Sequence, residues 1–151
     1  MIQRIQSVYF LLAGILPAFT FCVPMAQYLT EQGELQYVLN PWALSSVEGV
    51  VSHPWGLLTF TVLSMVMAVL CIFGYKNRRR QIAMSSLLLT LILILGLTYV
   101  AYGYSLGSTH SLRFLPDWGV LFPCFSFIFA ILGRSGVRKD EELVRAADRI
   151  R

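Results

Sequence analysis

Charged side chains are scarce in this 151-residue sequence, in which Asp, Glu, Lys and Arg together make up only 13% of the residues. A soluble domain contains about 25% charged residues. The low charge, a hydrophobic fraction of 56% and a mean hydropathy of +0.65 argue against a water-soluble protein and indicate lipid as the main solvent. The net charge of +4 does not indicate a nucleic-acid partner, because the cations flank apolar segments as they do in membrane proteins.

Residues that carry chemistry are also missing from the three longest apolar segments, which contain no Asp, Glu, Lys, Arg or His. Proton relays and intramembrane active sites need ionisable residues at depth, and haem b needs histidine ligands inside the spans. We therefore expect neither an enzyme nor a cofactor. The three cysteines, Cys22, Cys71 and Cys124, form no C-x-x-C pair, and we interpret them as packing residues.

Two histidines remain as candidate metal ligands. His53 and His110 fall in predicted outer loops, where Glu48 or Asp117 could complete a site. The histidines lie in separate segments and lack the spacing of a metal motif. The preferred interpretation is that they are polar residues at the membrane interface and bind no metal.

Four hydrophobic segments predict four transmembrane helices. Three uncharged intervals, of 26, 27 and 32 residues, exceed the length of about 20 residues that a spanning helix needs. The fourth interval has only 16 uncharged residues, between Asp117 and Arg134, and is the weakest of the set. In chain order, the predicted spans lie at about 8–28, 55–75, 82–104 and 115–133.

The distribution of cations predicts the orientation of these spans. With both termini in the cytoplasm, eleven of the twelve Lys and Arg residues are cytoplasmic, and only Arg113 lies outside. This asymmetry follows the positive-inside rule. We therefore predict an all-α bacterial inner-membrane protein. Residues 1–134 form a four-helix transmembrane bundle, and residues 135–151 form a cytoplasmic amphipathic tail with a short C-terminal helix.

Two further segments invite structural predictions. The outer loop, residues 29–54, contains two apolar stretches separated by the turn signal Asn40-Pro41, which predicts either a short hairpin or an interfacial flap over the bundle. In the tail, Asp140 is a suitable helix cap. Three tail residues that share one helical face are the candidate contacts for a protein partner: Leu143, Ala147 and Ile150. Four cations of the basic loop are candidate contacts for anionic lipid headgroups: Lys76, Arg78, Arg79 and Arg80.

The chain also resembles a known family. The similarity is carried by three blocks: residues 1–9 (MIQRIQSVY), residues 75–78 (YKNR) and residues 138–151 (RKDEELVRAADRIR). These blocks resemble a domain-of-unknown-function family of small four-span inner-membrane proteins of Bacteroidota. The resemblance implies location and topology but no activity and no functional residues.

Without a catalytic constellation, the sequence favours a non-enzymatic accessory or scaffold subunit of a larger inner-membrane complex. Such a protein would contact membrane lipids and other inner-membrane proteins through its helices and tail. The alternative is a protein that binds or transports a lipid or hydrophobic small molecule, with the outer loop as a lid over a groove between helices.

Overall fold

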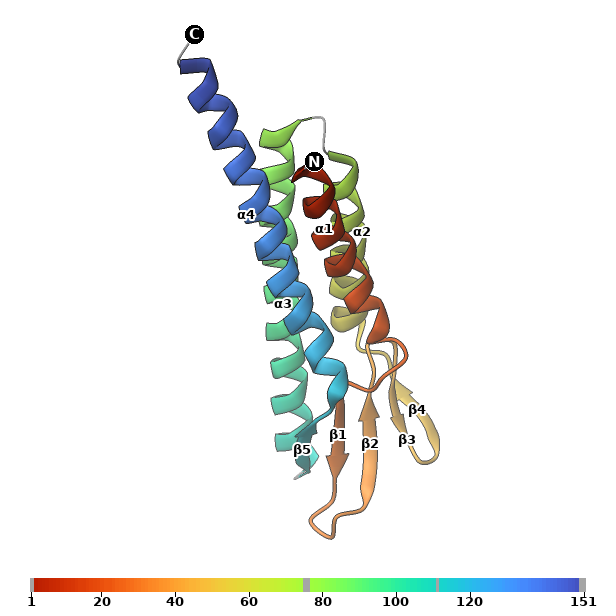
Figure 1. Cartoon of the computed structure of the whole chain (residues 1–151). Helices are drawn as coiled ribbons and strands as arrows, with labels where there is room; N and C mark the ends of the chain where they lie inside the picture. Colours follow the sequence, from red (N-terminus) through yellow and green to blue (C-terminus); the bar gives the residue numbers. More distant parts are fainter. Residues whose placement is uncertain (1, 75–76, 111, 150–151) are drawn as a thin grey trace.

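Four helices form an elongated bundle in the computed structural model, which describes residues 2–74, 77–110 and 112–149, with side chains for residues 5–74, 77–108 and 112–146. The helices are α1 (Ile2–Phe19), α2 (Trp55–Phe73), α3 (Arg78–His110) and α4 (Leu121–Arg149). Both termini lie at one end of the bundle, which we call the termini end, and the strands lie at the opposite sheet end (Figure 1).

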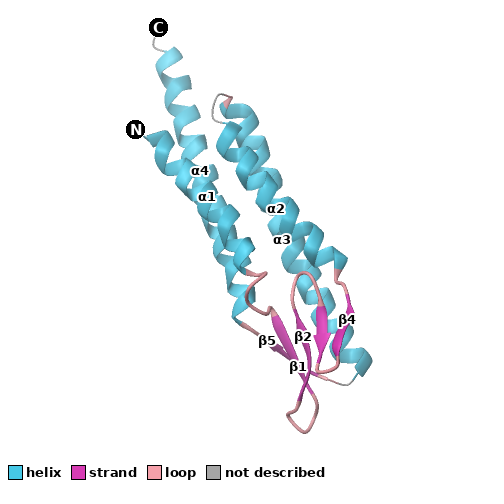
Figure 2. Ribbon diagram, turned by 90° about the vertical axis from the view of Figure 1, so that its right-hand side faces the viewer, coloured by secondary structure: helices cyan, strands magenta, loops and turns pink. Residues whose placement is uncertain are grey.

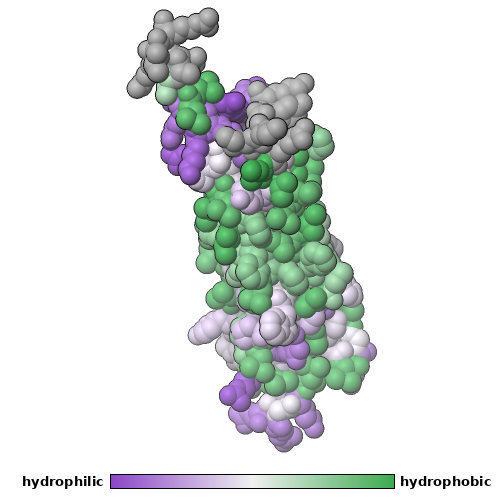
Figure 3. Space-filling model, in the orientation of Figure 1, coloured by the Kyte–Doolittle hydropathy of each residue, from purple (hydrophilic) through white to green (hydrophobic). Residues whose placement is uncertain are grey.

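On the face shown in Figure 3, apolar residues cover the middle of the bundle and polar residues gather toward its two ends. We call this apolar zone the apolar belt. Helices α2, α3 and α4 are long and apolar enough to cross a membrane, whereas the described part of α1, Ile5–Phe19, is shorter. The structure therefore confirms a mostly helical protein whose helices suit a membrane. The first span, which the length of its uncharged interval predicted to be secure, is the shorter helix. The last span, which was predicted to be the weakest, is one of the three helices of spanning length.

The first predicted span, 8–28, is wrong in its second half. Helix α1 ends at Phe19, and the chain then forms strand β1 (Ala26–Leu29). The absence of charge continues through both elements, so a count of uncharged residues could not separate helix from strand. At the helix end, the hydroxyl of Thr20 donates a hydrogen bond to the carbonyl of Pro17 at 2.6 Å. The 18 residues of α1 are about 27 Å long, against a hydrocarbon core of about 30 Å.

The last predicted span, 115–133, begins and ends too early. Residues 115–116 belong to strand β5 (Arg113–Pro116) and residues 118–120 to a short 3₁₀ helix, whereas α4 begins at Leu121. Helix α4 runs unbroken for 29 residues into the tail, so the prediction of a separate C-terminal helix is wrong. Asp140 lies inside this helix and does not cap it. Its carboxylate instead accepts a hydrogen bond of 2.7 Å from the side-chain amide of Gln6 in α1.

The prediction of an all-α fold is also wrong, because five strands form an antiparallel sheet at the sheet end (Figure 2). They are β1, β2 (Leu35–Leu39), β3 (Leu44–Ser46), β4 (Gly49–Ser52) and β5 (Arg113–Pro116), in the spatial order β4-β3-β2-β1-β5. The hairpin expected around Asn40-Pro41 is confirmed as the β2–β3 connection, where the Asn40 N–H donates to the Ala43 carbonyl at 2.9 Å.

The sheet packs against the long helix α3. Alternate residues of β1, Ala26 and Tyr28, are buried, and they belong to an apolar cluster that includes Leu95 and Tyr99 of α3. Helix α3 continues beside the sheet beyond the other helices (Figures 1 and 2). Sheet and bundle therefore share one core at this end of the molecule.

Small residues bring the helices together in the middle of the bundle. A Cβ added to Gly14 of α1 would lie only 3.0 Å from the Cβ of Ala68 in α2. The buried hydroxyl of Ser126 in α4 donates to the carbonyl of Ala13 in α1 at 2.6 Å. Small residues at helix interfaces permit such close approach. These positions are occupied by contacts within the chain and do not form an outward-facing surface for another subunit.

Candidate functional site

Among the side chains that the structure describes, no group of three or more His, Cys, Asp or Glu residues could hold a metal ion. His53 follows β4 and Asp117 follows β5, at opposite edges of the sheet, so four strand spacings of about 4.8 Å separate them. The Nδ1 atom of His53 lies 2.7 Å from the carbonyl oxygen of Trp42, and the carboxylate of Asp117 accepts from the Gln27 side-chain amide at 2.6 Å. Both groups hold loop structure, and the side chain of His110 lies outside the described residues.

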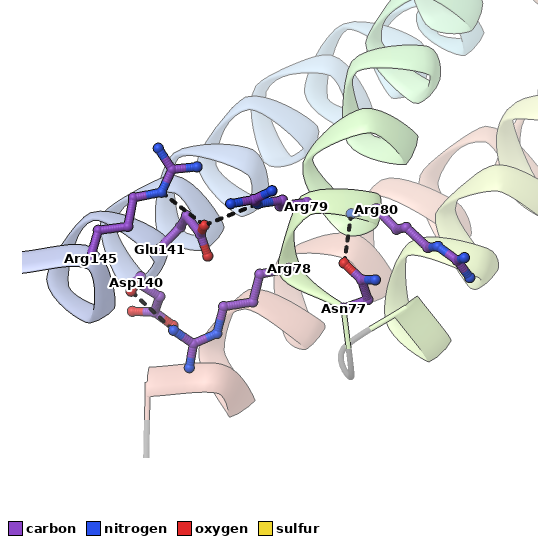
Figure 4. A network of polar contacts seen from close by, with 7 residues as sticks. All are labelled: Asn77, Arg78, Arg79, Arg80, Asp140, Glu141 and Arg145. Carbon is purple, nitrogen blue, oxygen red and sulfur yellow. Dashed lines mark hydrogen bonds and ion pairs between the residues drawn. The ribbon is translucent and has the colours of Figure 1, made fainter. Parts of the chain in front are cut away.

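Two cations that the sequence placed in the basic loop, Arg78 and Arg79, are the first residues of α3 and contact α4 at Asp140 and Glu141. Arg78 donates to the backbone carbonyl of Asp140 at 3.0 Å, and Arg79 lies 3.8 Å from a carboxylate oxygen of Glu141 (Figure 4). Arg145 reaches the same carboxylate at 3.0 Å. Two of the predicted lipid-contacting cations therefore interact with the protein itself. The side chain of Arg80 is exposed, and Lys76 lies outside the described residues.

The predicted partner face of the tail is exposed at its described position. Leu143 is 63% exposed, and its neighbour Val144, which the sequence argument did not single out, is 42% exposed. The side chain of Ala147 and all of Ile150 lie outside the described residues. This end of α4 extends beyond the other helices at the termini end (Figure 1).

A groove between α3 and α4 has a volume of about 580 Å³. Its lining is almost wholly apolar and includes Ile92, Gly96 and Val100 of α3, together with Val120, Cys124 and Phe127. Val100, on the rim, is more than half exposed, so the groove opens toward the surroundings of the bundle. We call it the apolar groove.

Met25 and Tyr99 border the apolar groove at the sheet end. Met25, which precedes β1, lines the groove, and its carbonyl accepts a hydrogen bond of 3.1 Å from the Tyr99 hydroxyl. Tyr28 packs in the same cluster and donates to the Tyr102 carbonyl at 3.3 Å. Burial, with a smaller contribution from Tyr99, raises the pKa of Tyr28 to about 12. Its phenol is therefore a protonated structural donor at neutral pH and not a base.

A second cavity, of about 360 Å³, lies between the same helices toward the termini end. Leu89 of α3 lines it, and α4 contributes Ile131, Arg134, Ser135, Arg138, Lys139 and Glu142. We call it the basic pocket, because it contains three cations and one carboxylate. The buried Nε atom of Arg134 has no hydrogen-bond partner among the described residues.

Sequence reasoning missed the basic pocket, although part of its signal was present. Ile131, Arg134, Arg138 and Glu142 are spaced by three or four residues and therefore share one face of α4. Their cations were counted only as determinants of orientation. Which neighbouring helix that face meets depends on tertiary packing and is not encoded in the spacing.

The apolar belt, the three helices of spanning length and the sheet at one end define the class: a mostly helical protein with the features of a membrane protein. Within this class the family is established. Residues 2–150 match the family described as a domain of unknown function (DUF4293), and the chain belongs to it. This confirms the family resemblance, whereas the bacterial group and the four-span layout stay predictions. No curated protein matches the chain.

Proposed function

We propose that this protein is a non-enzymatic accessory or scaffold subunit of a larger inner-membrane complex and contacts a protein partner through the extension of α4. The observation that carries the proposal is the pair of exposed apolar side chains, Leu143 and Val144, beyond the bundle. From Asp140 to Arg149 the extension is about 15 Å long. Contacts from Gln6, Arg78 and Arg79 hold its base and so fix its direction.

The contribution of the extension is tested by the double variant Leu143→Ser/Val144→Ser. We expect at least fivefold less partner to co-purify from the native membrane in mild detergent, because buried apolar anchors supply most of the binding energy of an interface. The matched control is Val47→Ser/Val50→Ser, which removes two exposed apolar side chains at the sheet end and should leave co-purification unchanged. A wild-type particle containing only this protein in several detergents would contradict the proposal.

The proposed orientation places both termini and the basic loop in the cytoplasm, because this puts eleven of twelve cations inside. In a background where the three cysteines are alanine, Gln32→Cys adds one thiol to the exposed β1–β2 loop and Arg145→Cys adds one to the tail. We expect an impermeant maleimide to label the first in intact cells and the second only after lysis. The reverse pattern would overturn the orientation.

A second candidate function is the binding of a lipid or hydrophobic small molecule, which the apolar groove favours. Its lining is apolar, it opens at the helix surface and its volume is within the usual range of about 300–1,000 Å³ for ligand sites. The outer segment expected as a lid, residues 29–54, contributes no residue to the lining, and Met25, which precedes β1, borders the groove at the sheet end. In this proposal the segment before β1 therefore acts as a fixed end wall, and no moving flap is involved.

A further inference from the structure

The apolar groove and the basic pocket follow one another along the seam between α3 and α4. On α4 their lining residues succeed one another at helical spacing, from Cys124 and Phe127 to Ile131 and Arg134. On α3, Leu89 of the basic pocket lies one turn from Leu93 of the groove. Residues three or four positions apart share a helix face. Both cavities therefore lie along the same side of the seam between α3 and α4.

Along the seam between α3 and α4, the lining residues change from apolar at the sheet end to basic at the termini end. From Val120 to Arg134 the distance along the helix is about 21 Å. One leaflet of a bilayer has a hydrocarbon thickness of about 15 Å, half of a core of about 30 Å. The apolar part is therefore long enough for an acyl chain whose headgroup lies at the basic pocket.

The charges of the basic pocket favour a negatively charged headgroup. Arg134, Arg138 and Lys139 outnumber Glu142, and the Nε atom of Arg134 is buried without an acceptor. A buried donor without a partner is costly, and phosphate oxygens are preferred acceptors for guanidinium groups. The earlier candidates, Arg78 and Arg79, already contact the protein, which leaves the cations of α4 as the better site.

We propose that the seam between α3 and α4 binds one phospholipid with a net negative headgroup. Its phosphate contacts Arg134, Arg138 and Lys139, and one acyl chain lies in the apolar groove against Phe127 and Gly96. Basic pockets between membrane helices on the cytoplasmic side bind such headgroups in other proteins. This inference rests on the second candidate function and names its ligand class.

Native mass spectrometry of the full-length protein tests the headgroup. The purified protein is exposed to phosphatidylglycerol or phosphatidylcholine of identical chains. We expect wild type to retain phosphatidylglycerol about tenfold better, because the cations of the basic pocket attract its net negative headgroup. The variant Arg134→Gln/Arg138→Gln/Lys139→Gln should lose this preference. Arg79→Gln/Arg80→Gln/Arg145→Gln removes equal charge at the same end and should keep it. Equal loss in both variants would overturn the proposal.

A second variant tests the acyl chain. Outside the local helix backbone, no heavy atom of the described residues lies within 4 Å of a Cβ added to Gly96, so Gly96→Leu directs a side chain into the apolar groove. Leucine also has a higher helix propensity than glycine, so this variant should fold. We expect it to retain several-fold less of either lipid. Inorganic phosphate at 10 mM should not release phosphatidylglycerol from wild type, and its release would identify an anion site without a lipid chain.

The outcomes distinguish a failure of the proposed ligand class from a failure of the second candidate function. If wild type retains lipid without preference for a negative headgroup, the ligand class is wrong, but the second candidate function stands. If Gly96→Leu retains as much lipid as wild type, the groove holds no chain and both are overturned. The complete arrangement is supported if Arg134→Gln/Arg138→Gln/Lys139→Gln loses the preference for phosphatidylglycerol and the control triple variant keeps it. Gly96→Leu must also retain less of both lipids.

Discussion

Replacement of Tyr28 by alanine is expected to lower the free energy of unfolding by about 3–5 kcal/mol, the range for truncating a large buried aromatic side chain. Tyr28 is fully buried and lies at the centre of the cluster that joins the sheet to α3. Its ring centroid is 5.6 Å from that of Phe114 in β5, which in turn lies 5.8 Å from Tyr99 in α3. The variant leaves a cavity where three elements meet.

Two controls separate the packing of Tyr28 from its hydroxyl group and from general effects. Tyr28→Phe removes only the 3.3 Å hydrogen bond to Tyr102 and should cost about 1 kcal/mol. Tyr104→Ala removes a tyrosine that is 80% exposed and should cost little. Stability is measured by chemical denaturation in one detergent, with proteolysis of the β1–β2 loop as a local readout. A small effect of Tyr28→Ala would mean that sheet and bundle do not share a core.

The helices were largely predictable, because a helix that crosses the hydrocarbon core needs a long apolar interval in the sequence. The second span was expected at 55–75, and α2 occupies Trp55–Phe73. The third was expected at 82–104, but α3 begins at Arg78 and ends at His110. The extra turns are polar. Hydropathy locates the apolar part of a helix but does not predict how far the helix continues into polar residues on either side.

The sheet was only partly predictable, because some strands pair with a neighbour in the sequence and others pair with a distant segment. The hairpin of β2 and β3 is local, and the turn signal Asn40-Pro41 located it. Strand β5 has only four residues and pairs with β1, which precedes it by more than 80 positions, with Tyr28 opposite Phe114. Nothing in the local pattern of Arg113–Pro116 indicates that partner. Leu115 and Pro116 were therefore assigned to the fourth predicted span, and Arg113 to an outer loop.

The candidate lipid site shows the same division between local and tertiary information. The sequence displays the cations of α4 and their shared face, but it does not identify the helix opposite them. The interpretation as a site requires Leu89 of α3 beside Arg134 of α4 and the groove that continues from both. For the tail, by contrast, the helical pattern alone predicted an apolar face, and Leu143 is exposed on it.

The junction between the sheet and α4 rests on a close backbone contact that only glycine permits. Gly119 is buried between Asp117 and the start of α4, in the short 3₁₀ helix η2 (Trp118–Val120), and its N–H donates to the Pro24 carbonyl at 3.0 Å. A Cβ at this position would collide with the Pro24 carbonyl oxygen and lie 2.7 Å from its carbonyl carbon and 2.9 Å from the Val23 oxygen. Since these are backbone atoms, no side-chain rotation relieves the contact.

We therefore expect Gly119→Ala to lower the free energy of unfolding by about 3 kcal/mol, at the upper end of the range for overpacking. The clash forces α4 away from the segment before β1, where Met25 and Val120 form the end wall of the apolar groove. Retention of phospholipid should consequently fall together with stability. The control Gly96→Ala adds the same methyl group where no heavy atom lies within 4 Å, so it should be neutral or slightly stabilising in chemical denaturation. Wild-type stability in Gly119→Ala would show that α4 and the Val23–Pro24 backbone do not approach this closely.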